Sequence, residues 1–201
     1  MKGFFLIISG PSGSGKSTLI KRLLKSSDDF YFSISSTTRA PRDGEVDGKH
    51  YHFISKKEFE ESIKKDEFLE WAYVHNDYYG TSLKEPTKAV DSGKIAILDI
   101  DVQGQKIAKS KLKERVSSIF LTTKNLKELE KRLTNRGSEE SQKLKKRLEN
   151  ALIEIKEIKE YDYLVINSDL EECYLELCAI VESLKFKTSN LDVDKFIKNW
   201  N

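Results

Sequence analysis

The residues best suited to chemistry lie near the start of the chain, in the run Gly10, Pro11, Ser12, Gly13, Ser14, Gly15, Lys16, Ser17 and Thr18. This run satisfies the G-x-x-x-x-G-K-[ST] phosphate-loop pattern. Its glycines lack a Cβ, so the backbone can turn its N–H groups inward around a phosphate. Lys16 supplies a mobile cation for the β- and γ-phosphates, and the Ser17 hydroxyl is an oxygen ligand for Mg²⁺. The run therefore predicts binding of a nucleoside triphosphate.

Two arginines form a second candidate site. Arg39 and Arg42 flank Ala40-Pro41, and the residue before a proline disfavours helix, so both lie on an extended or turning loop. Two guanidinium groups held close together favour an anion between them, and a phosphate matches their planar fork. Tyr51 could donate its hydroxyl to the same anion. The alternative is a basic loop that is simply solvated.

A pair of acids follows a predicted core strand. Residues 95–101 are apolar up to the carboxyl end, where Asp99 and Asp101 stand two positions apart. Such a strand fits a Walker B element beside the phosphate loop, holding Mg²⁺ through water. The two carboxylates point the same way if the strand stays regular to its end. Alternatively, one of them caps a helix that opens near Gly104.

The elements that must position these residues alternate along the chain. The apolar run Phe4–Ile8 predicts a buried parallel strand before the phosphate loop, and leucines and isoleucines at helical spacing follow the loop. Further strands are predicted at 30–36, 116–122 and 163–167, a turn at 76–81, and helices at 55–67, 83–93, 126–133, 142–160 and 170–184. This alternation predicts a parallel sheet flanked by helices.

Composition excludes several classes of protein. The 201 residues carry a net charge of only +2, which argues against a nucleic-acid binder. No apolar run approaches the roughly 18 residues of a membrane span, and the N-terminus lacks a signal-peptide cleavage site. Cys173 and Cys178 have the wrong spacing for zinc or a disulfide framework and are expected to be free thiols. A cytoplasmic location and no membrane partner are expected.

Several motifs together resemble the guanylate kinases. They are the run from Thr37 to Phe53 (TTRAPRDGEVDGKHYHF), the phosphate loop, FLEWAYVHNDYYGT, ILDIDVQG, the NRG and KRL pair, and VIN. The resemblance spans about residues 3–185. It implies a P-loop kinase that transfers phosphate from ATP to GMP, and also to dGMP, with Mg²⁺.

The resemblance also assigns a guanine site. Glu70 is a lone carboxylate in an apolar run, and a carboxylate can accept from the adjacent N1–H and N2–H₂ donors of guanine, which adenine lacks. Family positions matching Ser35 and Thr81 also touch the base. The GMP phosphate would be held by Arg39 and Arg42 with the hydroxyls of Tyr51 and Tyr79. We expect Asp101 near the base and Asp99 in the metal network, with both bordering the GMP site.

A polar helix–loop–helix resembles the lid of nucleoside monophosphate kinases. Arg136 and Arg147 match the family's lid arginines, and they would spread the charge of the transferring phosphoryl group together with Lys16 and Arg39. Arg132 is a weaker candidate for this role. By the same resemblance, Asn167 lies at a strand end beside the adenine.

We therefore predict one guanylate kinase-like domain over 1–201. Its core covers 1–33, 92–123 and 147–185, with an inserted monophosphate-binding part at 34–91, a lid at 124–146 and a C-terminal extension at 186–201. The sequence does not distinguish a monomer from a homo-oligomer. Three alternatives are a phosphopeptide-binding module, which usually has a damaged phosphate loop, a GTPase, which needs an N-K-x-D element, and a kinase for another monophosphate.

Overall fold

The computed structural model describes residues 2–74, 76–135 and 141–200, and a parallel five-stranded sheet forms its centre. The strands, in spatial order, are β2 (Phe30–Phe32), β7 (Ile95–Leu98), β1 (Phe4–Ser9), β8 (Val116–Thr122) and β9 (Tyr163–Ile166). All four pairings between neighbours are parallel, as predicted. The carboxyl ends of these strands therefore meet at one edge, where open parallel sheets bind ligands.

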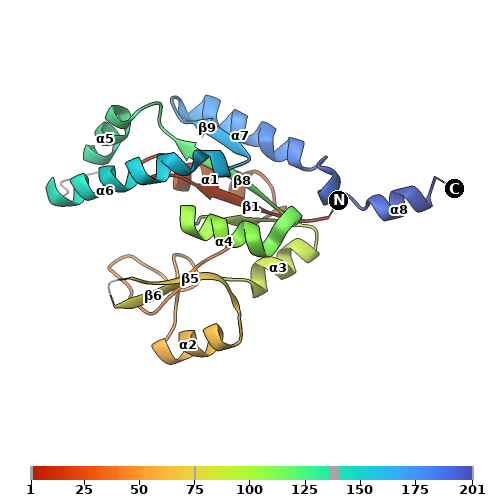
Figure 1. The fold of residues 1–201 in the computed structure, drawn as a ribbon, viewed down its shortest axis with the longest axis horizontal. Coiled ribbons are helices and arrows are strands. Elements are labelled where there is room, and N and C mark those ends of the chain that lie inside the picture. The colour runs from red at the N-terminus through yellow and green to blue at the C-terminus, as the bar shows by residue number, and fades with distance from the viewer. Residues whose placement is uncertain (1, 75, 136–140, 201) are drawn as a thin grey trace.

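Helices cover both faces of this sheet (Figure 1). Alternate residues of β1 point to opposite faces, so Phe4, Leu6 and Ile8 pack with α1 (Lys16–Ser26) and α7 (Leu170–Leu184). Phe5 and Ile7 pack on the other side, with α3 (Lys84–Asp91) and α4 (Val102–Leu112). A continuous apolar run buried on both faces thus holds the phosphate loop at the end of the central strand.

A second, four-stranded sheet lies beside this core (Figure 1). Its order is β4 (His52–Phe53), β3 (Ser36–Thr37), β6 (Asp77–Ser82) and β5 (Phe68–Val74). The helix α2 (Lys56–Lys64) begins with the capping box expected at Ser55, and its Phe59 ring stacks on Phe68 with ring centroids 4.3 Å apart. This sheet carries the residues expected to hold the monophosphate.

Two sequence predictions in this region are wrong. The single strand at 30–36 is two strands in different sheets, because β2 pairs with β7 and β3 pairs with β6. The turn at 76–81 is the strand β6, paired antiparallel with β5, and the chain reverses just before it, with Asn76 at φ 71°. Cross-strand pairing, rather than local turn chemistry, decides this segment.

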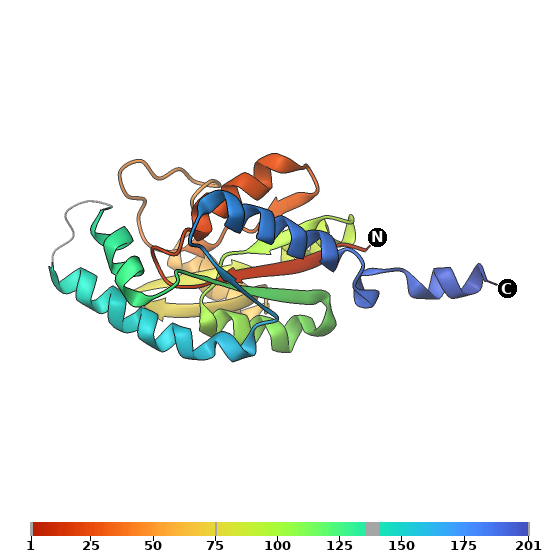
Figure 2. The same cartoon turned by 90° about the horizontal axis from the view of Figure 1, so that it is seen from above.

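Two helices pack against each other at one end of the molecule, and the longer one runs from there along the body (Figure 2). Asn125 caps α5 (Leu126–Thr134) as predicted, and α6 spans Ser141–Glu154. Their buried side chains Leu129, Leu133 and Ala151 form a small core of their own. The helix predicted to continue to residue 160 changes to the 3-10 helix η2 (Ile155–Glu160) before β9.

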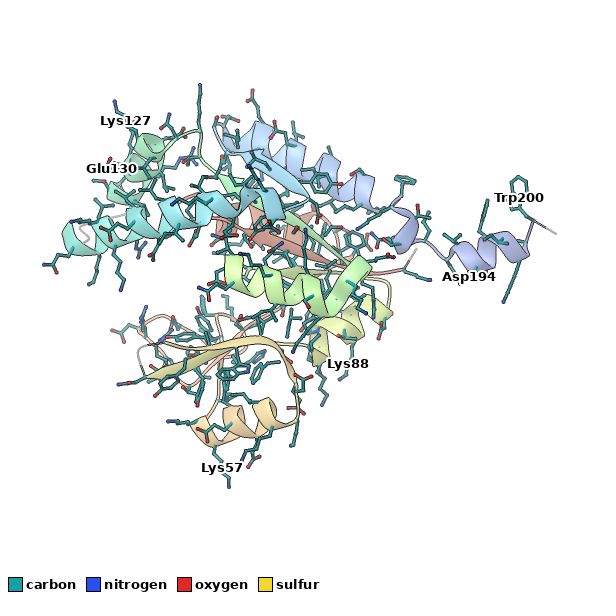
Figure 3. The ribbon with its side chains drawn as sticks, viewed as in Figure 1. Lys57, Lys88, Lys127, Glu130, Asp194 and Trp200 are labelled. Carbon is teal, nitrogen blue, oxygen red and sulfur yellow. The ribbon has the colours of Figure 1, made fainter. Side chains whose placement is uncertain are left out.

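The C-terminal extension is in part attached to the core. After α7, the short η3 (Thr188–Asn190) buries Asn190, whose carbonyl accepts a hydrogen bond from the Lys2 N–H at 2.9 Å. The last helix, α8 (Val193–Lys198), extends away from the body and carries Asp194, with Trp200 just beyond it (Figure 3). Another short turn, η1 (Lys113–Arg115), precedes β8.

Two further sequence expectations concern membranes and thiols. In the described ranges, no helix has the length and apolar character needed to cross a bilayer. Cys173 and Cys178 are free thiols, as expected.

Candidate active site

The phosphate loop joins β1 to α1 in a conformation that glycine alone adopts readily. Gly10, Gly13 and Gly15 have φ values of 142°, 91° and 102°. A Cβ on Gly10 would stand 1.9 Å from the carbonyl oxygen of Leu121 on the neighbouring strand β8. The sheet therefore fixes where the loop begins, and the helix dipole of α1 points back at it.

Lys16 and Asn167 both donate hydrogen bonds to backbone carbonyls of this loop. The Lys16 ammonium donates to the carbonyl oxygen of Gly10 and lies 3.5 Å from that of Pro11. The buried Asn167, directly after β9, donates its side-chain amide to the Ser14 carbonyl at 2.8 Å. Asn167 was expected beside the adenine; in this structure its amide supports the loop.

A cavity of about 320 Å³ opens over the loop. Its walls are Gly10–Ser17, Asp99, Ile100, Asp101 and Glu154. Burial raises the pKa of Asp99, and the nearby Lys16 ammonium partly offsets this rise. The cavity therefore holds the Ser17 hydroxyl and the Asp99 carboxylate together, which are the oxygen ligands expected for Mg²⁺.

Neither aspartate lies on the strand, because β7 ends at Leu98. The condition under which Asp99 and Asp101 would point the same way, a strand that stays regular to its end, is therefore not met. Asp101 is the N-cap of α4, where its carboxylate accepts from the backbone N–H groups of Gln103 and Gly104 at 3.0 and 2.8 Å. The helix-cap alternative is confirmed for Asp101, which also borders the cavity.

The three residues expected at the guanine base form one hydrogen-bonded chain. The Thr81 hydroxyl donates to the Glu70 carboxylate at 2.6 Å, and the Ser35 hydroxyl lies 3.3 Å from that of Thr81. Burial raises the pKa of Glu70; the Thr81 hydrogen bond opposes the rise and the charge of Asp101 adds to it. The strands β5 and β6 thus hold one oriented carboxylate in a partly dry environment.

Arg39 already has an anionic partner in the protein. Both of its terminal nitrogens donate to the Glu45 carboxylate at 2.9 Å, and the backbone N–H of Arg42 donates to the same carboxylate at 2.7 Å. These contacts, the Arg39 pair first, lower the pKa of Glu45 to about 2. Glu45 was not among the predicted site residues, although this carboxylate stands only three positions after Arg42 in the sequence.

The two tyrosines expected at the monophosphate lie around this pair. The Arg39 guanidinium is 5.5 Å from the centre of the Tyr51 ring, and the Tyr51 and Tyr79 rings are 6.2 Å apart. Hydrogen bonding to Glu45, and secondarily to Tyr79, raises the pKa of Arg39. The side chain of Arg42 is exposed. The loop and strand β6 therefore bring Arg39, Tyr51 and Tyr79 together, with Arg42 at the surface of the loop.

One of the two arginines expected in a lid reaches the phosphate loop. Arg147, on α6, donates to the Ser12 hydroxyl at 3.0 Å. Arg136 lies outside the described residues. Arg132 donates to Glu128 and to the Asn167 carbonyl at 2.7 Å, so it supports the loop region through Asn167.

A phosphate loop on a parallel sheet, with a second sheet beside it that carries the residues expected to bind an anion and a base, is the arrangement of a P-loop protein of the nucleoside monophosphate kinase class. The family model described as "Guanylate kinase" matches residues 2–184. The chain therefore belongs to the guanylate kinase family, as the resemblance implied.

Individual relatives agree with this assignment. The chain is 54% identical to the guanylate kinase of Campylobacter jejuni (strain RM1221), with 100% of this chain and 98% of the relative covered. It is 47% identical to that of Helicobacter pylori (strain 26695), over 97% and 94% of the two chains. A crystal structure of guanylate kinase from Anaplasma phagocytophilum superposes with a TM-score of 0.78 at 31% identity, covering 98% and 95%.

Proposed function

We propose that this protein transfers the γ-phosphoryl group of ATP to GMP, giving ADP and GDP, and that it also accepts dGMP. The observation that carries the proposal is the oriented Glu70 carboxylate, hydrogen-bonded to Thr81 at 2.6 Å in the sheet next to the phosphate-loop cavity. Family membership supports the same reaction.

The base is selected by hydrogen-bond donors. Glu70 would accept from the N1–H and N2–H₂ groups of guanine, with Ser35 and Thr81 beside it and Asp101 close by. AMP offers no matching pair of donors and would leave the half-buried carboxylate with no donor besides Thr81, which costs more than a lost contact. The groups assigned here address the base and the phosphate, so removal of the sugar 2′-hydroxyl should be tolerated.

The phosphate of GMP would enter the cluster of Arg39, Arg42, Tyr51 and Tyr79. Arg39 keeps further N–H donors besides those bound to Glu45, because a guanidinium carries five. Its orientation is fixed by the carboxylate before substrate arrives, so less side-chain freedom is lost on binding.

The triphosphate of ATP would lie in the phosphate loop, from Gly10 to Thr18, with Lys16 released from its loop carbonyls to the phosphates. The Ser17 hydroxyl and Asp99 fit Mg²⁺, which when bound neutralises charge on the transferring phosphates. Asn167 would border the adenine while holding the loop.

The chemical step breaks the bond between the γ-phosphorus and the β–γ bridging oxygen and forms a new bond from a phosphate oxygen of GMP. It needs positioning and charge neutralisation more than acid–base chemistry. Lys16, Arg39, Arg147 and Arg136 would supply the positive charge. Closure of α5 and α6 over the cavity would exclude water, which would otherwise hydrolyse ATP.

A coupled assay with GMP, dGMP, AMP, CMP and UMP tests the proposal. We expect phosphorylation of GMP and dGMP, with kcat/KM for the other three lower by about 10⁴ or more. AMP or UMP turnover equal to that of GMP would favour a kinase for another monophosphate. ATP binding without any transfer would favour a binding module.

A further inference from the structure

Glu154 is a cavity residue that neither the motifs nor the family assignment singled out. It is the last residue of α6, it is half-buried, and it lines the phosphate-loop cavity together with Asp99 and Asp101. Among the described residues, none forms a hydrogen bond or ion pair with its carboxylate. Partial burial of a carboxylate without such a partner disfavours its charged form, and a ligand that supplies a hydrogen-bond donor or a cation would remove this cost.

The helix directs Glu154 and Arg147 to the same place. They are seven positions apart on α6 and so share one face. Arg147 donates to Ser12 in the loop, and Glu154 lies on the wall of the same cavity. One helix therefore brings a cation and an anion to the phosphate loop, and only the cation suits a bare triphosphate.

The charged groups around Glu154 indicate that a cation would stabilise its carboxylate. Burial raises its pKa, the Lys16 ammonium opposes that rise, and the Asp101 carboxylate adds to it. When Lys16 turns to the phosphates of ATP, Glu154 faces added negative charge, which a cation between them would offset. Ser14 also lines this cavity, and its buried hydroxyl has no hydrogen-bond partner in the described chain, so a polar ligand near the loop could complete it.

We propose that Glu154 is a positioning residue for the Mg²⁺ that accompanies ATP, accepting hydrogen bonds from water molecules bound to the ion. This rests on the proposed function, because it deepens its ATP half. Over the ranges 2–74, 76–135 and 141–200, no three His, Cys, Asp or Glu side chains are arranged to hold a metal directly. An ion held by phosphates, Ser17 and water needs such outer carboxylates to orient it.

The test measures ATP binding by calorimetry, with Mg²⁺ and with a chelator, for the wild type, Glu154→Gln and Glu149→Gln. Glu149 is an exposed carboxylate on the same helix and controls for net charge. In Glu154→Gln we expect metal-free ATP to bind at least as tightly as in the wild type, because a repelling charge is gone. The gain in affinity caused by Mg²⁺ should fall about tenfold. Glu149→Gln should match the wild type in both conditions.

The opposing sign of the two effects separates this role from a structural one. A Glu154 that only supports the fold, or only holds Lys16, would change affinity equally with and without Mg²⁺, and that result would overturn the proposal. If Glu154→Gln does not fold, Glu154→Asp should show a smaller loss of the Mg²⁺ effect, and an unchanged effect there also overturns it. A wild type that binds no ATP would instead refute the proposed function.

Discussion

Replacing Glu70 by Gln changes one atom of the proposed guanine site and keeps its shape. Thr81 donates to one carboxylate oxygen, so the Gln carbonyl oxygen should keep that position. The Gln amide nitrogen then takes the other position, where it presents a donor to the donors of guanine. The variant therefore converts an attraction into a mismatch without emptying the site.

The magnitude follows from two terms. Loss of a hydrogen bond to a charged acceptor costs about 1.5–3 kcal/mol, and leaving buried donors unpaired costs about 1–3 kcal/mol. Together they give about 2.5–6 kcal/mol, which corresponds to a loss of about seventyfold to about ten-thousandfold or more in kcat/KM for GMP. ATP is not bound by Glu70 in this scheme, so its KM should stay close to that of the wild type.

A coupled steady-state assay with ATP saturating measures kcat/KM for GMP, and a second titration measures KM for ATP. Glu61→Gln is the matched control, because Glu61 is an exposed carboxylate on the helix that packs on the same sheet. A loss below tenfold for Glu70→Gln would refute the assignment of Glu70 to the base. An equal loss for ATP would indicate damage to the fold instead.

Three further predictions concern stability. Glu70→Gln should raise the unfolding temperature at neutral pH, because the raised pKa of Glu70 means that its ionisation costs the folded state more than the unfolded one. The gain should vanish below the ordinary carboxyl pKa of about 4.3, where Glu70 is protonated in both states. A gain that does not change with pH would contradict this prediction. Gly10→Ala should lower the free energy of unfolding, measured by denaturant titration, far more than Gly44→Ala, because a Cβ on Gly10 would meet a carbonyl oxygen at 1.9 Å. A Cβ on Gly44 meets nothing within 4 Å, so that variant should lose only about 1–2 kcal/mol for its positive φ. Equal losses would argue against the loop packing described. Asn167→Ala should lower the free energy of unfolding by about 1–3 kcal/mol and raise KM for ATP, because it leaves the buried Ser14 carbonyl without its donor. Unchanged values in both measurements would show that the amide does not support the loop.

Local signals made part of the structure predictable. The phosphate loop, the capping box at Ser55 and the cap at Asn125 each depend on residues within a few positions, and the structure has all three. The long helix at 170–184 and the strand at 116–122 also have the predicted bounds, since their apolar patterns are continuous. Such features need no knowledge of distant partners.

Long-range pairing explains what the sequence did not predict. The strand β6 exists because β5 and β3 lie on its two sides, and no local pattern specifies those neighbours. Asp101 caps a helix because β7 ends three residues before it. Glu154 reaches the cavity only because α6 packs over a loop about 140 positions earlier in the chain. These residues acquire their roles from the fold and not from a motif.

The arginine pair shows that a predicted binding group can already have a partner within the folded protein. Two guanidinium groups on one loop predicted an anion between them, and the protein supplies Glu45, which the Arg39 guanidinium contacts but Arg42 reaches only with its backbone N–H. Lys16 is likewise held by loop carbonyls, and Glu70 by Thr81. These three groups, Arg39, Lys16 and Glu70, thus each have a protein partner that orients them before substrate binds. Binding then exchanges or extends hydrogen bonds that already exist, which costs less entropy than ordering free side chains.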